Sequence, residues 1–256
     1  MPRQSWLANV ARSSGYSVVE VDGWQTRGSD QFTPKATVWH HTATPASSKG
    51  DYPTLNLIVN GRSDLPGPLA NYGLGRSGTI YVIAAGKANH AGSGGWKGLV
   101  GNASVIGIEA EHPGTKGTPW PAEQLDAYRR LTAAICLELG VGADMVCGHK
   151  EWAPTRKIDP IDLNMTSERA AVAALMEDDM AEAKIAKPDW LPQSDIQKLL
   201  DFGVLTSQPT AETIDFWRQL ALMARLVKNL PASGTVGPPG PRGPAGPSPK
   251  SATFAY

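Results

Sequence analysis

Cysteine is scarce in this sequence, which has only Cys136 and Cys147 among its 256 residues. The two are not closely spaced, so they provide neither a disulfide framework nor a Cys-x-x-Cys metal site. We interpret both as reduced thiols.

A net charge of either sign is also lacking, because 24 Lys and Arg residues balance 24 Asp and Glu residues. Proteins that bind nucleic acid by neutralising phosphates carry an excess of positive charge. The balance therefore argues against nucleic acid as a partner.

Long apolar runs are the third absence. No stretch approaches the roughly 18 apolar residues of a membrane-spanning helix. The first residues, Met-Pro-Arg-Gln-Ser-Trp-Leu-Ala, also lack the apolar run of a signal peptide. We therefore expect no membrane partner and a protein that starts in a cytoplasm.

The length suits one domain of about 150 to 180 residues with an appendage. Alternating β-forming and helical patterns predict an α/β fold. Residues 1–33 are predicted to be an irregular leader with one short strand at 16–21. The other predicted elements are strands at 36–41 and 105–111, a hairpin turning at Ser77-Gly78, and helices at 52–59, 121–139 and 167–176.

The stretch from Gly148 to Pro160 carries the most chemistry. It contains His149, with Lys157 eight residues later and Asp159 ten residues later, in a segment that Pro154 and Pro160 stiffen. An imidazole and a carboxylate form half of a metal site. A zinc site with an open position for water needs a third protein donor, and Val38-Trp39-His40-His41-Thr42 is the obvious source.

Four motifs in order resemble the zinc-dependent N-acetylmuramoyl-L-alanine amidases of type 2, which include amidase-type phage lysozymes and peptidoglycan recognition proteins. They are VWHHTAT, NYGLGRSGTIYVIAAGKANHAG, IGIEAE and GHKEWAPTRKIDP, and the similarity spans residues 34–178. The resemblance implies a central mixed β-sheet of five or six strands, flanked by helices on both faces, with zinc in a groove at one edge.

Side chains alternate between the two faces of a strand, so His40 and His41 cannot both reach one metal ion. The resemblance selects His40 as a ligand, together with His149 and Asp159, and leaves His41 as a packed or hydrogen-bonded neighbour. Many members of the family use cysteine as the third ligand. Asp159 occupies that position here, as in other active members.

The resemblance also implies roles for two residues in the second motif. Tyr72 matches a tyrosine that lies beside the zinc in many members and can assist catalysis, although a tyrosine in a half-buried strand is more often structural. His90 lies in the family's His-Ala-Gly turn, where we expect it to line the substrate cleft or support a ligand. A fourth protein ligand would displace the catalytic water.

Glu109 and Glu111 lie two residues apart, hence on one face of a strand. The resemblance assigns catalysis to Glu109, the acid of the Gly-Ile-Glu triplet, which would move a proton from water to the leaving amine. Lys157 matches a family lysine that stabilises the oxyanion. We expect Glu111 and His112 to face solvent.

The end of the chain departs from the family. Residues 188–230 are predicted to form a helical appendage. Within it, Phe216, Leu220, Met223, Val227 and Leu230 recur at coiled-coil spacing, which also fits an amphipathic helix docked on a neighbour. Residues 234–248 repeat Gly-X-Y as collagen does, or form a stiff extended tail. We predict weak self-association through residues 211–248 as one alternative.

The sequence therefore predicts a zinc-dependent hydrolase that cleaves the amide between N-acetylmuramic acid and L-alanine in bacterial peptidoglycan. A phage endolysin, held in the host cytoplasm until lysis, is the favoured setting, and a cytoplasmic recycling amidase is second. A non-catalytic peptidoglycan-binding module and a virion or spore protein with a vestigial amidase domain are the alternatives.

Overall fold

A computed structural model describes residues 3–184 of the chain. Its centre is a six-stranded sheet in the order β1-β6-β5-β9-β2-β10. The β5–β6 pair is antiparallel and the other pairs are parallel, so the sheet is mixed as predicted. The strands are β1 (Val18–Glu20), β2 (Ala36–His41), β5 (Tyr72–Leu74), β6 (Ile80–Val82), β9 (Val105–Ala110) and β10 (Val146–Gly148).

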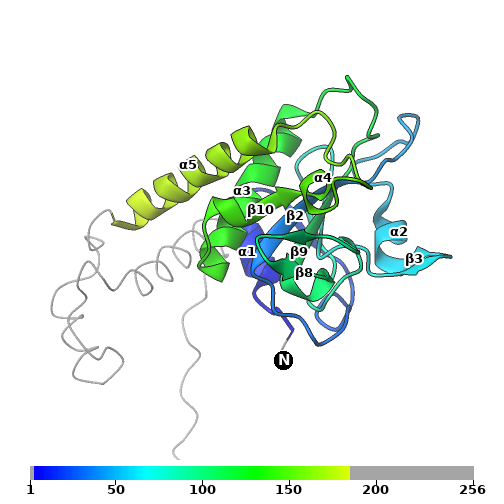
Figure 1. Ribbon diagram of the computed structural model, residues 1–256, viewed down its shortest axis with the longest axis horizontal. Coiled ribbons are helices and arrows are strands. Elements are labelled where there is room, and N and C mark those ends of the chain that lie inside the picture. The colour runs from blue at the N-terminus through cyan, green and yellow to red at the C-terminus, as the bar shows by residue number, and fades with distance from the viewer. Residues whose placement is uncertain (1–2, 185–256) are drawn as a thin grey trace, which may run out of the picture.

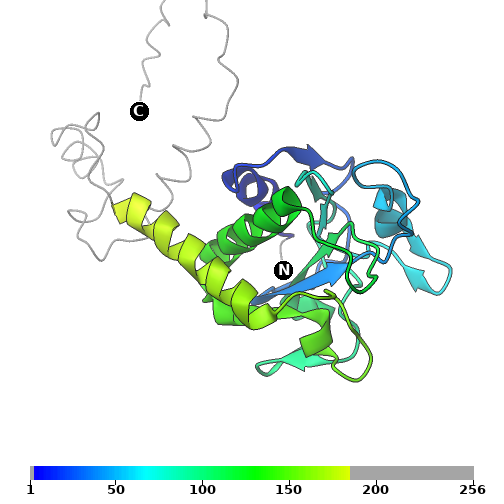
Figure 2. The same cartoon turned by 90° about the horizontal axis from the view of Figure 1, so that it is seen from above.

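Three helices cover one face of this sheet: α1 (Leu7–Ser13), α3 (Ala122–Leu139) and α5 (Met165–Lys184). Figure 2 shows α5 lying against α3. The opposite face carries two short helices, α2 (Leu55–Asn60) and α4 (His149–Trp152), together with long loops (Figure 1). The remaining elements are the hairpins β3 (Gly61–Arg62) with β4 (Leu65–Pro66) and β7 (Gly95–Trp96) with β8 (Leu99–Val100), and the 3-10 helices η1 (Asn102–Ser104) and η2 (Ala143–Met145).

Alternation along the central strands divides the core between the two faces. Trp39 of β2 and Ile106 and Ile108 of β9 pack with α3. Val38 and Val105, which directly precede Trp39 and Ile106, point to the other face, where they pack with Trp152 of α4. His40 and Glu109 therefore lie on the face that α4 and the loops cover.

Helix α3 supports the strands from behind. It begins after Pro121 and ends at Gly140, which adopts the left-handed conformation that suits glycine (φ 65°). The Tyr128 ring stacks on Trp39 with centroids 3.8 Å apart. The buried Tyr128 hydroxyl accepts a hydrogen bond from His40 N (2.8 Å) and donates to Ile108 O (2.8 Å), so α3 ties β2 to β9 where the candidate site begins.

The first 33 residues differ from the predicted irregular leader. Leu7–Ser13 form α1, which packs into the core, because its apolar side chains at Leu7, Val10 and Ala11 share one face. The predicted strand is present as β1, which pairs with β6 at the edge of the sheet. This segment is therefore part of the domain's core.

The far end of the chain lies outside the described residues. The predicted second helix is present, although it begins at Met165 and extends to Lys184. The predicted appendage at 188–230 and the Gly-X-Y tail at 234–248 fall beyond residue 184. Within residues 3–184, no helix has the length and apolar character needed to cross a bilayer.

The burial of α1 predicts a large stability effect of a substitution in the N-terminal segment. Leu7 is fully buried, whereas Leu57 of α2 is 43% exposed. We expect Leu7→Ala to lower the free energy of unfolding by about 2–5 kcal/mol and Leu57→Ala to lower it by much less. Urea denaturation followed by circular dichroism measures both. Equal effects of the two substitutions would show that α1 does not contribute to the core.

Candidate active site

Three side chains converge at one edge of the sheet. His40 lies near the end of β2, His149 is the first residue of α4, and Asp159 lies in the following loop. His40 Nδ1 is 2.9 Å from His149 Nδ1 and 3.1 Å from Asp159 Oδ2, and His149 Nδ1 is 3.0 Å from the same oxygen. All three residues are buried. The predicted ligand set is thus brought together in space.

Hydrogen bonds on the far sides of the two rings set their tautomers. His149 Nε2 lies 2.9 Å from Ala91 O, which can only accept, so Nε2 carries the hydrogen. His40 Nε2 is 3.0 Å from His90 Nδ1, and His90 Nε2 is 3.2 Å from Val105 O. That carbonyl makes His90 Nε2 a donor and His90 Nδ1 an acceptor, so His40 Nε2 must also be a donor. The network therefore leaves both Nδ1 lone pairs directed at Asp159.

The convergence of these atoms suits a cation. Two imidazole lone pairs and a carboxylate oxygen meet without a hydrogen between them, an arrangement that is repulsive unless positive charge lies among them. Zinc bonded at 2.0–2.1 Å with tetrahedral angles would place neighbouring donor atoms about 3.3 Å apart, close to the observed spacing. Burial lowers the pKa of His40 to about 4, against the opposing effect of Asp159, so this ring is neutral near pH 7.

The fold places these donors through strand ends and one anchored loop. Parallel pairing of β2 with β10 sets Trp39 opposite Gly148. The next residues, His40 and His149, therefore lie side by side at the carboxyl-terminal ends of the two strands. The loop that bears Asp159 is fixed by Lys150. Its backbone N donates to Asp159 O (2.7 Å), and its Nζ donates to Pro160 O (2.8 Å) and Leu163 O (2.6 Å).

Glu109 faces the donor cluster from the neighbouring strand. It is the partner of His40 in the β2–β9 register, and its Oε1 lies 4.0 Å from His40 Nδ1. Its Oε2 is buried and makes no hydrogen bond to the described residues. Burial, and then the nearby Asp159, raise the pKa of Glu109 well above its usual value. This carboxyl group can therefore hold a proton and release it.

Lys157 is the predicted cation of the site. Its side chain is half-buried. Burial is the main cause of the lowered pKa of His40, to which the charge of Lys157 adds, and of the raised pKa of Glu109, which that charge opposes. A positive charge that acts on these two groups can also stabilise a negative oxygen that develops beside them.

His41 and Tyr72 point away from the cluster. His41 Nδ1 accepts a hydrogen bond from Ile161 N (3.1 Å), as expected for a hydrogen-bonded neighbour. The expectation that Tyr72 lies beside the metal is wrong. Its side chain is fully buried on the face covered by α1 and α3, and its hydroxyl donates to Leu7 O (2.9 Å). Its structural interpretation is the one that holds.

Glu111 and His112 were expected to face solvent, and both are buried. Glu111 accepts hydrogen bonds from the hydroxyl (2.5 Å) and backbone N (3.3 Å) of Thr54 and lies 3.8 Å from Arg76. His112 stacks on Trp120 with ring centroids 4.2 Å apart. Segments distant in sequence cover both residues, which no local pattern indicates.

The groups that orient the histidines could not be predicted from the sequence. They are the backbone carbonyls of Ala91 and Val105, and every residue type has a backbone carbonyl. His90, by contrast, was expected to line the cleft or support a ligand, and its ring contacts His40 edge-on with centroids 5.1 Å apart.

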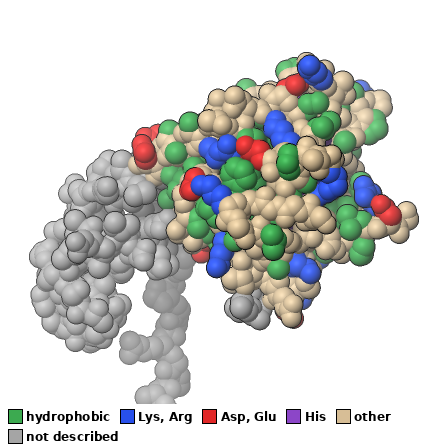
Figure 3. All heavy atoms as spheres, in the orientation of Figure 1, with side chains coloured by type: hydrophobic (Ala, Val, Ile, Leu, Met, Phe, Trp, Pro, Cys, Tyr) green, Lys and Arg blue, Asp and Glu red, His purple; other side chains and the backbone are tan. Residues whose placement is uncertain are grey.

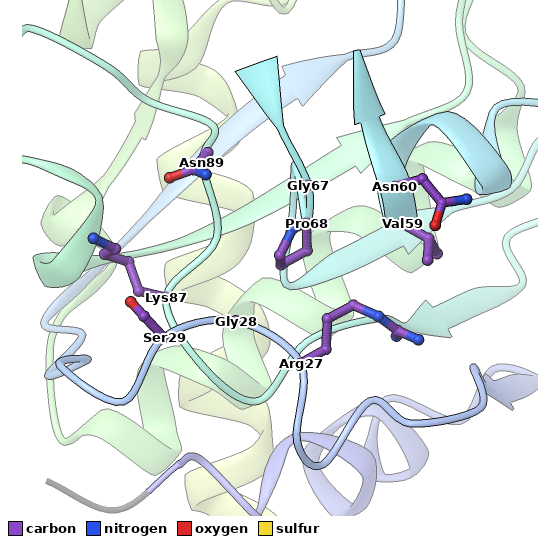
Figure 4. A pocket seen from close by; sticks show the side chains of 9 residues that line it. All are labelled: Arg27, Gly28, Ser29, Val59, Asn60, Gly67, Pro68, Lys87 and Asn89. Carbon is purple, nitrogen blue, oxygen red and sulfur yellow. The ribbon is translucent and has the colours of Figure 1, made fainter. Parts of the chain in front are cut away.

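A separate cavity of about 520 Å³ is lined by Asn89, the residue before His90, and by segments around Gly28 and Gly67 (Figure 4). Arg27 and Lys87 give it positive charge, and Asn60 and Asn89 add amide groups. None of the three donors lines it, so it is distinct from the cluster. Elsewhere on the molecule, basic and acidic side chains are interspersed on the face shown in Figure 3.

The opposite orientations of the two neighbouring histidines predict opposite effects on metal binding. We expect His40→Ala to weaken zinc binding by more than about a hundredfold, because even residues that only support a ligand contribute about ten- to a hundredfold. His41→Ala should change the affinity far less. Competition with a chromophoric chelator measures both, and equal losses would contradict the assignment of His40 as the donor.

Comparison with known proteins identifies a matching family and several similar solved structures. The family model described as N-acetylmuramoyl-L-alanine amidase matches residues 30–162. A crystal structure of an AmpD derivative is 24% identical and aligns with 67% of this chain and 98% of its own, with a TM-score of 0.48. AmiD from E. coli, in complex with the substrate anhydro-N-acetylmuramic acid-L-Ala-D-gamma-Glu-L-Lys, is 21% identical over 81% of this chain and 86% of its own (TM-score 0.45).

A third solved structure, the endolysin amidase LysCS from Clostridium intestinale, is 21% identical over 60% of this chain and 93% of its own (TM-score 0.44). No curated protein sequence matches. The family model spans more than half of the chain and includes all three converging donors. The chain therefore belongs to the N-acetylmuramoyl-L-alanine amidase family and is an enzyme of that class.

Proposed function

We propose that this enzyme uses zinc, held by His40, His149 and Asp159, to hydrolyse the amide between N-acetylmuramic acid and L-alanine of peptidoglycan. The observation that carries the proposal is the convergence of two imidazole lone pairs and one carboxylate oxygen at 2.9–3.1 Å. Zinc bound there supplies a Lewis acid that polarises the scissile carbonyl and lowers the pKa of water.

Glu109 is the proposed proton carrier. It takes a proton from the attacking water and passes it to the departing amine of L-alanine. Three properties support this role: its position opposite His40, its buried and unpartnered Oε2, and its raised pKa. A carboxyl group whose pKa is raised well above its usual value is a stronger base and can both accept and donate a proton.

Lys157 is the proposed stabiliser of the oxyanion. As water adds to the carbonyl, negative charge grows on the carbonyl oxygen, and an ammonium already held nearby lowers the energy of that charge. The effect of Lys157 on the pKa of Glu109 and His40 supports its closeness to the reacting groups.

Asp159, and not a cysteine, completes the proposed ligand set. Cys147 lies two residues before His149 but packs in the apolar cluster with Val38 and Trp152. Burial raises the pKa of the Cys147 thiol far above its usual value, and Cys147 is not among the three side chains that converge. The carboxylate is the anionic donor available at this position.

The non-catalytic alternative is a module that binds peptidoglycan without cutting it. The presence of all three donors, Glu109 and Lys157 at one place favours the enzyme. A phage endolysin remains our preferred setting, with cytoplasmic storage until lysis. Substrate contact through His90 and weak self-association through residues 211–248 remain predictions.

Replacing Glu109 tests the chemical step. We expect Glu109→Gln to lower the rate of amide hydrolysis by about 10²–10⁴ while zinc content and binding to cell walls stay unchanged. The exposed Glu123→Gln in α3 is the matched control and should hydrolyse walls normally. The assay counts new L-alanine amino termini released from purified walls. Undiminished release by Glu109→Gln would remove Glu109 from the mechanism.

Replacing Tyr72 tests its exclusion from the site. Tyr72→Phe deletes a hydroxyl that bonds to the buried Leu7 carbonyl, so we expect the free energy of unfolding to fall by about 1–3 kcal/mol. Hydrolysis at a temperature where the variant is fully folded should be unchanged. A large loss of turnover without a loss of stability would show that Tyr72 takes part in catalysis.

A further inference from the structure

One side chain holds the turn that orients both histidine donors. Asn102, at the start of η1, directs its Oδ1 at three consecutive backbone N–H groups. The distances are 3.2 Å to His90 N, 2.7 Å to Ala91 N and 3.3 Å to Gly92 N. Three donors pointing at one oxygen fix the direction of the intervening peptide planes, not only the position of the chain.

The three residues held in this way all contact the donor cluster or its support. His90 Nδ1 accepts from His40 Nε2, and Ala91 O accepts from His149 Nε2. Gly92 O accepts from the indole nitrogen of Trp152 (3.3 Å), the last residue of α4. Asn102 Oδ1 thus holds in place both residues that accept hydrogen bonds from the imidazole rings of His40 and His149.

Further contacts suit this turn to its position. An ideal Cβ on Gly107 would lie 2.5 Å from His90 Cγ, so glycine in β9 leaves the space that the ring occupies. Arg156 adds a second bond to Ala91 O (3.1 Å) and one to Ser93 O (2.6 Å). Hydrogen bonds therefore hold the turn at both kinds of backbone group: Asn102 accepts from its N–H groups, and Arg156 donates to its carbonyls.

We propose that Asn102 is a positioning residue that sets the tautomers of His40 and His149 through the His90–Gly92 turn. If Ala91 O and His90 Nδ1 leave their places, nothing compels either ring to carry its hydrogen on Nε2. The Nδ1 lone pairs are then no longer directed at Asp159 in every molecule. The inference deepens the proposed zinc site and rests on it.

The test compares full-length Asn102→Leu with Asn102→Asp. Leucine has a similar size and cannot accept a hydrogen bond, whereas aspartate keeps an acceptor oxygen in the same place. We expect Asn102→Leu to weaken zinc binding by about ten- to a hundredfold and Asn102→Asp to restore most of the affinity. Competition with a chromophoric chelator measures zinc binding directly, without any use of activity.

A second readout reports the tautomers themselves. The chain has five histidines, few enough to assign their side-chain ¹⁵N–¹H correlations in the metal-free protein. We expect wild type to show His40 and His149 with hydrogen on Nε2 and Asn102→Leu to show a mixture of tautomers. Asn164→Ala is the matched control, because Asn164 Oδ1 accepts from Thr166 N and Ser167 N at the start of α5 and should affect stability alone.

The outcomes separate the two proposals. Failure of the wild-type protein to bind zinc would overturn the proposed function. Tight binding by wild type together with equal affinity and unchanged tautomers in Asn102→Leu would overturn the role of Asn102. Should the leucine variant not fold, Asn102→Ala replaces it. Loss of the fold in both variants would show that Asn102 is required for folding of the whole domain, and this would also contradict the proposal.

Discussion

The site depends on the direction of two nitrogen lone pairs. Each donor histidine uses Nε2 to donate a hydrogen bond, His149 to the Ala91 carbonyl and His40 to His90, which in turn bonds to the Val105 carbonyl. A carbonyl oxygen cannot donate, so the hydrogens stay on Nε2 and the Nδ1 atoms are left to face a carboxylate. A buried cluster of three acceptors is unfavourable by itself. A cation bound among them would offset this cost, which supports the proposed metal site.

The two faces of the sheet have different roles, one in the stability of the fold and the other in the candidate site. On one face, α1, α3 and α5 bury the apolar side chains, and Tyr128 links β2 to β9. On the other face, the ends of the same strands present His40 and Glu109, and Lys150 anchors the loop that carries Asp159. A substitution on the helical face should therefore act through the free energy of unfolding, whereas one at the strand ends should act on metal binding or turnover.

Sequence reasoning succeeded where a rule of local geometry applied. Alternation along a strand showed that His40 and His41 face opposite sides, and the family resemblance then selected His40 and Glu109, which lie side by side in the β2–β9 register. It failed where distant segments decide the environment. Tyr72 sits in a strand of only three residues, too short for its pattern to show which face is covered by α1, and Thr54 and Arg76 bury Glu111 from far away in the sequence. The apolar positions of α1 went unnoticed because the helix has only seven residues.

Cell walls digested by the protein before and after removal of its metal provide the most direct test of the account. Purified walls would be incubated with the protein as isolated, after stripping by a chelator, and after zinc is restored. The account predicts that L-alanine amino termini appear only when zinc is present, without new reducing sugar ends. Release that persists in the stripped protein, or that creates reducing ends, would contradict it.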